Sequence, residues 1–534
     1  MNTEKNFVCY EDFGAVGDGV SNDFAAIKAA HDYANEKGLP VFCKSDATYR
    51  ISDTRIDGEV SIIRVKTNTD FNGATLIFDD EKLSADDGTG MHDKPIFDIS
   101  SDYPMFELSR EDVAKIGKVG RETKKINVKL DYPALLILNN DNHNVFIRYG
   151  GDANPGVPAF DLVLIDENGN IDESTPILFD YDEVTRVQVI RVDVAPIVFG
   201  NAKIITKVSR VSIRREDGKI VRDYFIRNID VTRPNTTIKG IKHEIVGEYT
   251  VEEQAKGLCC PSYYGIINTS YTNNVLIEGC SIPARRYYRV AGTYGFNAYR
   301  TNKVTVKDCV QPNFYKPDGV ISTNGGEYWG WGGVNNTKNL VYDNVEITRY
   351  DAHAGLVNGK IINSHVSIIN LIGGGDLLIE NSLIEHDTIF NLRPDYGATW
   401  RGSITIKNCK IRPMGRRFYL FSHLWTNIDF GQPCHFPNVL VDNLSFENKA
   451  VPLTICRPRK TDDPNCATVL EEKNIHLAVR ENGEKNLNPY VPPKYMKLIN
   501  NEAGLDFFIE DLPFFENTEI EGFKKISVED ALSL

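Results

Sequence analysis

The chain has 534 residues, with 74 acidic and 60 basic side chains and a formal net charge of −14. This length exceeds what one hydrophobic core needs, so a main body with an additional module is expected. Lysine and arginine form no dense patch, so a nucleic-acid partner is not expected. No run of about 18 apolar residues occurs, so a membrane-spanning helix is not expected either.

The cysteines and the N-terminal residues bear on cofactors and location. The ten cysteines include the adjacent Cys259 and Cys260 but no CxxC pair, so we expect free thiols, no structural zinc and no cofactor. Residues 1–7 lack the basic-then-apolar pattern of a signal peptide. We therefore expect a cytoplasmic protein, or one that leaves the cell by another route or has lost its leader.

The first elements expected along the chain are a glycine-rich turn and a helix. Residues 12–19 read DFGAVGDG, and Asn22 or Asp23 suits the N-cap of a helix that continues to about Lys37. The apolar stripe of this helix consists of Ala26, Ile27 and Ala30. Asp12 and Asp18 are expected to be structural.

This opening resembles that of the pectate-lyase-like β-helix superfamily, which includes polygalacturonases, other polysaccharide hydrolases and lyases, and phage tailspikes. The resemblance implies a solenoid of stacked rungs whose first rung is capped by the helix, with the Gly-Asp-Gly turn packed beneath it. A solenoid needs such a cap because its first edge would otherwise stay open. The resemblance covers the opening 60 residues closely, and the rungs over 236–446.

Residues 104–195 do not fit the repeat that follows them. Short β-like runs alternate there with turn signals such as DENG at 166–169. The runs are LLIL at 135–138, NVFIR at 144–148, DLVLI at 161–165 and VQVI at 187–190. We expect a small β-barrel or sandwich inserted into the solenoid.

Seven segments between residues 273 and 446 share alternating β-forming residues, a bend residue and another β-former. Their aligned bend column consists of Gly279, Asp308, Asn344, Asn363, Asn381, Asn408 and Asn443. The shortest spacing, 18 residues from Asn363 to Asn381, is about the length of one bare turn of three short strands. Because stacked Asn side chains can bond one another, we expect the column from Asn344 to Asn443 to be buried and stacked at one bend.

The column after the bend is small or apolar and is expected to point inward. It consists of Cys280, Cys309, Val345, Ser364, Ser382, Cys409 and Leu444. These segments lack a 3.6-residue period, and an antiparallel sandwich would carry the Asn residues only by chance. We therefore predict an all-β fold, a right-handed parallel β-helix with an N-terminal capping helix and an inserted β-barrel or sandwich.

The expected division of the chain has four parts. They are the cap and first rungs at 1–103, the inserted module at 104–195, the main solenoid with a carbohydrate groove at 196–446, and a C-terminal tail packing on the solenoid at 447–534.

Between the repeat segments lie second β-like stretches that carry aromatic, His, Asp and Arg residues. They include Tyr264–Asn268, Asp351–Gly355, Ser367–Leu371, Thr388–Arg393 and Phe418–Ser422. Since strand side chains alternate, Asp351 and His353 share a face, as do Arg393 and Asp395. We expect this second sheet to be the functional face.

The candidate catalytic residues are Asp351, Asp395, His353 and Asp318. One rung separates the strands of Asp351 and Asp395, so their carboxylates are expected ~10 Å apart in a solvent-filled groove, nearer the inverting than the retaining geometry. Asp318 and Glu327, on the previous rung, are rivals for either role.

Candidate sugar-binding residues gather in one loop and in the tryptophans, because aromatic faces stack on sugar rings and guanidinium groups bind carboxylate or sulfate. They are Arg393, Tyr396, Trp400, Arg401, Trp329, Trp331 and Glu327. All four tryptophans, Trp425 included, fall near the second sheet. We expect at least two of them to line the groove.

The paired carboxylates favour a glycoside hydrolase acting on a poly- or oligosaccharide. The RYDAH and LRPDYG motifs resemble a bacterial branch of the superfamily distinct from polygalacturonases, because the one Asn-Thr-Asp lies at 68–70 and neither Gly-His-Gly nor Arg-Ile-Lys occurs. One alternative is a polysaccharide lyase that uses His353, Arg393 and Arg401 on a uronate. Another is a tailspike or adhesin that only binds glycans. The sugar and the oligomeric state stay open.

Overall fold

The computed structural model describes the larger part of the chain. The described residues are 6–82, 93–148, 153–210, 224–258, 260–286, 292–323, 327–416, 418–422, 433–447, 451, 453–456, 491, 493–499, 508–510, 518–521 and 524–526. They divide into two compact units. Unit 1 comprises Met1–Pro104, Arg191–Gly333 and Glu346–Thr348. Unit 2 comprises Met105–Ile190, Val334–Val345 and Arg349–Leu534.

Unit 1 begins with the turn and helix expected from the sequence. The 3-10 helix η1 (Tyr10–Phe13) and β1 (Asp18–Asn22) precede α1 (Phe24–Lys37), which ends at Gly38 in the left-handed conformation. Asp23 is the N-cap residue, but its carboxylate accepts the backbone N–H groups of Val16 and Gly17 rather than one of the helix. The acidic cap therefore ties the glycine-rich turn to the start of the helix.

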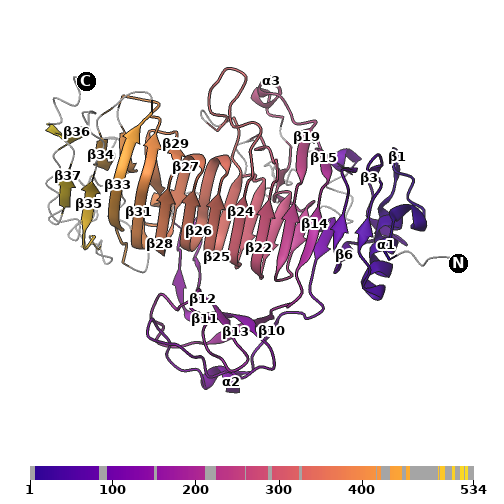
Figure 1. The fold of residues 1–534 in the computed structure, drawn as a ribbon, viewed down its shortest axis with the longest axis horizontal. Helices are drawn as coiled ribbons and strands as arrows, with labels where there is room; N and C mark the ends of the chain where they lie inside the picture. Colours follow the sequence, from indigo (N-terminus) through magenta and orange to yellow (C-terminus); the bar gives the residue numbers. More distant parts are fainter. Residues whose placement is uncertain are drawn as a thin grey trace. The chain divides into compact units, whose positions relative to one another are not determined.

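Three ladders of parallel strands form the body of unit 1 (Figure 1). The first contains β2 (Val41–Phe42), β7 (Thr69–Asp70), β14 (Ile197–Gly200), β18 (Thr236–Lys239), β22 (Asn273–Glu278) and β24 (Asn302–Lys307). The second contains β6 (Ile63–Val65), β9 (Phe97–Ile99), β17 (Ile229–Val231), β21 (Ile267–Ser270) and β23 (Phe296–Tyr299). The third contains β1, β3 (Thr48–Ile51), β8 (Thr75–Asp79), β15 (Lys203–Lys207) and β19 (Lys242–Val246).

Short elements connect these rungs. They are β4 (Arg55–Ile56), β5 (Glu59–Val60), η2 (Asp80–Lys82), β16 (Tyr224–Phe225), α3 (Val251–Ala255) and β20 (Ser262–Tyr263). None of the helices in the described residues is long and apolar enough to cross a bilayer.

Unit 2 contains two further parallel ladders, and several strands of the first are longer than those of unit 1. One ladder contains β25 (Gly332–Asp343), β26 (Glu346–Ile362), β28 (Gly373–Glu380), β31 (Trp400–Ile411), β33 (Asn438–Phe446), β35 (Met496–Ile499) and β37 (Thr518–Glu521). The other contains β27 (His365–Leu371), β30 (Thr388–Leu392), β32 (Phe418–Phe421), β34 (Leu453–Cys456), β36 (Phe508–Glu510) and β38 (Lys524–Ile526). The short strand β29 (Leu383–Ile384) pairs with β27 and β31.

The strands after residue 447 differ from the expected tail. Strands β34 to β38 pair in parallel with rung strands, beginning with Leu453 beside Phe418 and Met496 beside Val439. Alternating sequences such as Met496-Lys-Leu-Ile499 bury every second side chain, which is the pattern of a rung. In its described residues this stretch therefore extends the ladders.

The segment of unit 2 from Met105 to Ile190 contains an antiparallel sheet. Its strands are β10 (Phe106–Glu107), β11 (Ala134–Val145), β12 (Val157–Ile165) and β13 (Arg186–Arg191), in the order β10-β13-β11-β12, and α2 (Arg110–Ala114) follows β10. Its own hydrophobic cluster includes Leu136, Leu138, Val163, Val187 and Val189. We call these strands and α2 the inserted sheet.

The bend column lies where the sequence predicted, but for a different reason. All seven residues have a left-handed φ, from 50° at Asn381 to 63° at Asn443. Asn, Asp and Gly tolerate this conformation better than other residues, which explains the column. The expected burial is wrong, since Asn344, Asn363, Asn381 and Asn408 are exposed. Stacking occurs at the surface, where Asn443 Nδ2 donates to Asn408 Oδ1 at 2.9 Å.

The inward column is confirmed, since each of its seven residues is buried. Its polar members also accept backbone hydrogen bonds from the preceding rung. Ser364 Oγ accepts the N–H of Val345 at 3.1 Å, and Ser382 Oγ accepts that of Ser364 at 3.1 Å. Small hydroxyls and thiols at this column therefore satisfy a donor that the bend leaves inside the solenoid.

Candidate active site

The predicted residues of unit 2 lie together, but as an ion-paired network. Arg393, directly after β30, donates from Nε to Asp395 Oδ1 at 3.0 Å and from Nη2 to Oδ2 at 2.5 Å. Arg148, just after β11 of the inserted sheet, donates to the same Oδ2 at 2.7 Å. The two guanidinium groups lie 4.9 and 5.6 Å from the ring centroid of Tyr396. Asp395 is therefore shared by two arginines.

His353 is held in one tautomer. Arg393 Nη1 lies 2.7 Å from His353 Nδ1, and a guanidinium only donates, so Nδ1 accepts and Nε2 carries the proton. Burial lowers the pKa of His353 to about 4. The charge of Asp351 opposes this change, and the nearby arginines add to it. His353 is therefore neutral near pH 7 and can donate, but not accept, at Nε2.

Asp351 does not face a solvent-filled groove, and that expectation is wrong. Its side chain and those of Tyr350 and Ala352 are all fully buried, so both faces of β26 are covered here and alternation does not expose either one. Burial alone would raise the pKa of Asp351. Arg349, His353 and Arg393 outweigh burial and lower this pKa overall, and Arg349 Nε donates to Asp351 Oδ2 at 2.9 Å. Asp351 is an ionised carboxylate inside the network.

The three described tryptophans do not gather at an open surface as expected. Trp331 and Trp400 are fully buried, because the solenoid interior accommodates the indole rings, and Trp400 Nε1 donates to the carbonyl of Gly375 at 3.1 Å. Trp329 is half-buried with its ring against that of Tyr294. Trp425 lies outside the described residues.

The remaining candidates lie at exposed or ion-paired positions. In unit 1, Asp318 accepts the N–H of Val320 at 3.0 Å in an exposed turn. This hydrogen bond and, to a lesser extent, the charge of Lys316 lower the pKa of Asp318. Glu327 contacts Arg286 at 3.1 Å. In unit 2, Arg401 is exposed with its guanidinium 4.9 Å from the ring centroid of Phe179.

A pair of carboxyl groups that the sequence analysis missed lies on the second ladder of unit 1. Asp98 in β9 and Asp230 in β17 occupy the same register on neighbouring strands. Their flanking residues are fully buried, so both aspartates point to the outer face, where each is half-buried. Neighbouring strands lie ~4.8 Å apart, so the two side chains stack directly over one another. We call them the Asp98–Asp230 pair.

The environment of the pair raises the pKa of both carboxyl groups. Burial raises the pKa of Asp230 to about 6; the charge of Asp98 adds to this rise, while Asn268 Nδ2, 2.5 Å from Asp230 Oδ1, opposes it. Burial also raises the pKa of Asp98, and Ser100, Arg64 and other polar neighbours offset only part of this rise. Two stacked carboxylates resist double ionisation, so the proton of the pair resides on Asp230 near pH 6.

Amide and phenol groups surround this pair. Asn268 and Asn297 continue its row on β21 and β23, and Asn268 Oδ1 and Asn297 Nδ2 are buried and find no partner among the described side chains and backbone. Tyr264 lies close enough to Asp230 for that charge to contribute, after burial, to the raised pKa of its phenol. No group of three or more His, Cys, Asp or Glu side chains arranged for a metal ion occurs in the part of the chain that the structure describes.

A sequence signal for this pair exists in hindsight. The segments FDIS at 97–100, IDVT at 229–232 and INTS at 267–270 share one pattern. In each, an apolar residue is followed by an acidic or amide residue, a β-branched residue and a hydroxyl residue. The first two copies stand on either side of the inserted sheet, which hides their repetition along the chain.

No family model matches the chain, and no curated protein matches it. Among solved structures, it is similar to the Gp54 tailspike of Acinetobacter baumannii bacteriophage AP22, solved with A. baumannii capsular saccharide, with a TM-score of 0.52 and 9% identity over 96% of this chain and 79% of that chain. It is also similar to the tailspike gp61 of Pseudomonas phage phi297, with a TM-score of 0.47 and 11% identity over 85% of this chain and 80% of that chain.

A third similar structure is the Streptococcus pneumoniae surface adhesin PfbA, with a TM-score of 0.39 and 12% identity over 84% of this chain and 89% of that chain. At these identities the likeness concerns the fold and not the site. With its parallel ladders and its likeness to the AP22 tailspike, this chain is a right-handed parallel β-helix protein.

Proposed function

We propose that this protein is a carbohydrate-active enzyme that hydrolyses a glycosidic bond at the Asp98–Asp230 pair. The observation that carries the proposal is the stacking of Asp98 and Asp230 in one register on neighbouring strands, where burial first of all raises the pKa of Asp230 to about 6. Glycoside hydrolysis needs one protonated carboxyl to donate to the leaving oxygen and one ionised carboxylate.

The stacking of the pair favours the retaining course. A strand spacing of ~4.8 Å is close to the ~5–5.5 Å between the carboxyl groups of retaining enzymes and well below the inverting range. Asp230 protonates the leaving oxygen from Oδ2, and Asp98 attacks the anomeric carbon to form a glycosyl ester. Water then gives a proton to Asp230, attacks the anomeric carbon and releases Asp98 as a carboxylate.

A glycan substrate is supported by the surroundings of the pair. Tyr264 offers an aromatic ring near Asp230, and Asn268, the next residue in the row, adds an amide group bonded to Asp230. The AP22 tailspike, which shares the fold, was solved in complex with a capsular saccharide.

The residues expected from the sequence offer less to this chemistry. Asp351 is buried and ionised, and Asp395 is ion-paired to two arginines. A lyase would need a base, but His353 carries its proton on Nε2, and Asp395 and Asp351 raise the pKa of Arg393 in spite of its burial.

The test compares Asp98→Asn and Asp230→Asn with the wild type on a panel of bacterial capsular and plant polysaccharides. Reducing ends and product masses report cleavage. Each variant is expected to lose about 10²–10⁴-fold in rate, as the removal of a general acid or its partner does. Asp395→Asn is the matched control and should keep the rate.

Three outcomes would contradict this assignment. Full activity of Asp230→Asn with loss in Asp395→Asn would return the chemistry to the residues expected from the sequence. Ultraviolet absorbance of an unsaturated uronate product would show a lyase. Glycan binding without any cleavage by the wild type would show a protein that only binds.

A further inference from the structure

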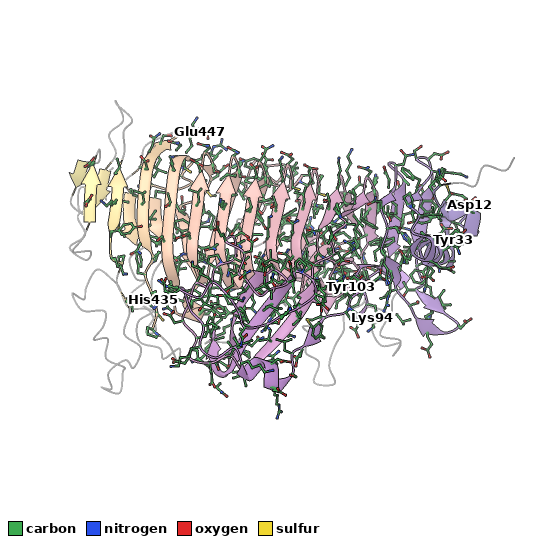
Figure 2. All side chains as sticks on the ribbon, turned by 60° about the horizontal axis from the view of Figure 1, so that its bottom comes forward. Asp12, Tyr33, Lys94, Tyr103, His435 and Glu447 are labelled. Carbon is green, nitrogen blue, oxygen red and sulfur yellow. The ribbon has the colours of Figure 1, made fainter. Side chains whose placement is uncertain are left out.

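A cavity of about 490 Å³ lies in unit 2 between the inserted sheet and the rung strands. Its lining includes Phe146, Phe179, Arg401, Asn140, Glu183 and His435. Figure 2 labels His435, which lies in the chain just before β33. This volume falls in the range of about 300–1,000 Å³ that small-molecule sites occupy.

One aromatic ring of this cavity is held at a conformational cost. Phe146 has a φ of 55°, in the left-handed region that bulky residues avoid. Its ring lies over Gly355, where an added Cβ would come within 2.5 Å of Phe146 Cε2, and Gly355 itself has a φ of 93°. Strained backbone of this kind persists where the surrounding structure imposes it, and it gathers at ligand sites.

The polar lining combines charges of both signs with neutral donors and acceptors. The Arg401 guanidinium stacks over Phe179, and Asn142 Nδ2 donates to Glu183 Oε1 at 2.8 Å. Burial, with the charge of Arg401, lowers the pKa of His435 to about 4, so this imidazole is neutral near pH 7. Asp180 and Asp182 also line the cavity, so its acidic groups outnumber the arginine and disfavour an anionic ligand. Such a surface suits an uncharged molecule rich in hydroxyl groups.

The two walls of the cavity are fixed to one another. Lys338 of β25 donates to Asp161 of β12 at 2.6 Å, and both side chains are buried. Arg148 joins the inserted sheet to Asp395 at 2.7 Å. The cavity is therefore formed before any ligand arrives, which lowers the cost of binding.

We propose that this cavity is a second, non-catalytic carbohydrate site that binds an uncharged sugar ring stacked on Phe146. It rests on the proposed function only for the class of ligand. Arg401 and Glu183 bind its hydroxyl groups, and no residue of the Asp98–Asp230 pair belongs to the cavity. Retention of a glycan chain here would raise the local concentration of substrate.

The experiment uses the full chain carrying Asp230→Asn, so that bound glycans are not cleaved. A glycan array of neutral and uronate-containing oligosaccharides identifies ligands, and calorimetry measures their affinity. Phe146→Leu in this background keeps an apolar side chain and removes the aromatic face, so it should weaken neutral glycans at least about tenfold. Phe42→Leu, a change at an exposed ring of unit 1 outside the cavity, should leave the affinity unchanged.

A second variant protects the test against misfolding. Arg401 is exposed, so Arg401→Gln should keep the melting temperature and lower the affinity for the same glycans. The proposal would be overturned if both variants bound glycans with the affinity of the Asp230→Asn parent, if only uronates bound, or if no glycan bound at all. Binding with a wild type that cleaves nothing would reject the proposed hydrolase and leave this site standing.

Discussion

Asp230 depends for its role on a proton that burial retains near neutral pH. Its pKa is raised to about 6 by burial first and by Asp98 second, so the fraction of protonated Asp230 falls above that pH. The rate should then fall about tenfold per pH unit above pH 6, because a general acid acts only while protonated. Measurement of kcat/KM from pH 4 to 9 checks this, and a rate that rises steadily to pH 9 would contradict it.

The same raised pKa makes the fold less stable at neutral pH than in acid. A carboxyl whose folded pKa lies near 6, above its unfolded value of about 4, stabilises the fold below pH 4, and this contribution is lost as the pH rises through 6. Asp230→Asn removes the titration and keeps an oxygen that accepts from Asn268. The variant should therefore gain about 2–3 kcal/mol relative to the wild type between pH 4 and pH 7.

Urea unfolding of both proteins at the two pH values measures this difference. Asp395→Asn is the control, and it should lose stability at pH 7 because it leaves Arg393 and Arg148 without their shared carboxylate. A variant whose stability tracks the wild type at every pH would show that Asp230 titrates normally.

Single residues also mark where inference from sequence reached its limit. The structure brings Asp351, His353, Arg393 and Asp395 into one network, but alternation does not explain it, because Asp395 lies in the 3-10 helix η5 (Pro394–Tyr396) and not in a strand. Alternation could not reveal that both faces of β26 are covered at Asp351, because burial depends on chain segments distant in sequence. Asp98 was missed because its strand has only three residues.

At the scale of elements, α1 contains a buried histidine that makes this N-terminal helix sensitive to acid. His31 is fully buried, bonds Tyr10 Oη at 2.8 Å, and burial lowers its pKa to about 3. Because the unfolded histidine binds a proton near pH 6.5, this contribution to stability is complete above pH 6.5 and is lost as the pH falls toward 3.

The loss expected from His31 is about 2 kcal/mol at pH 5. His31→Gln keeps an acceptor for Tyr10 and does not titrate, so its stability should vary less with pH between 6.5 and 4. Hydrogen exchange of the α1 amides at pH 5 and 7 localises the effect. Equal pH dependence in wild type and variant would contradict it.

The inserted sheet is joined to the rungs of unit 2 by a buried ion pair. Lys338→Met removes the partner of Asp161, whose carboxylate is then buried without its counter-charge, and should cost about 3–5 kcal/mol. Replacement of both residues, Lys338→Met with Asp161→Leu, should recover most of this loss. Denaturant unfolding of the two singles and the double variant gives the coupling, and additive losses would argue against it.

The sequence indicated β structure in the inserted sheet but not its attachment. Runs such as LLIL at 135–138 have the apolar character of the buried strand β11. The partners Lys338 and Asp161 are far apart in the chain, and neither belongs to a motif. Contacts of this kind depend on the final docking of elements, which local patterns do not encode.

At the scale of the whole molecule, the fold was predictable because each rung repeats one local solution. The bend column requires a left-handed φ, and the column after it requires a small inward side chain, so both leave a mark at regular intervals. The physical reason inferred from the sequence, burial of stacked Asn, was wrong, yet the alignment held because conformation selects the same residues as stacking does.

The 18-residue interval between Asn363 and Asn381 has a consequence for how such a protein changes length. Tandem duplication of a segment of this size places a new bend residue and a new inward residue in register, and each existing strand keeps a neighbour. Gain or loss of whole intervals therefore preserves the fold, whereas a gain of one residue reverses every side chain up to the next bend. This scaffold therefore changes length more easily by gain or loss of whole rungs than by insertion of single residues.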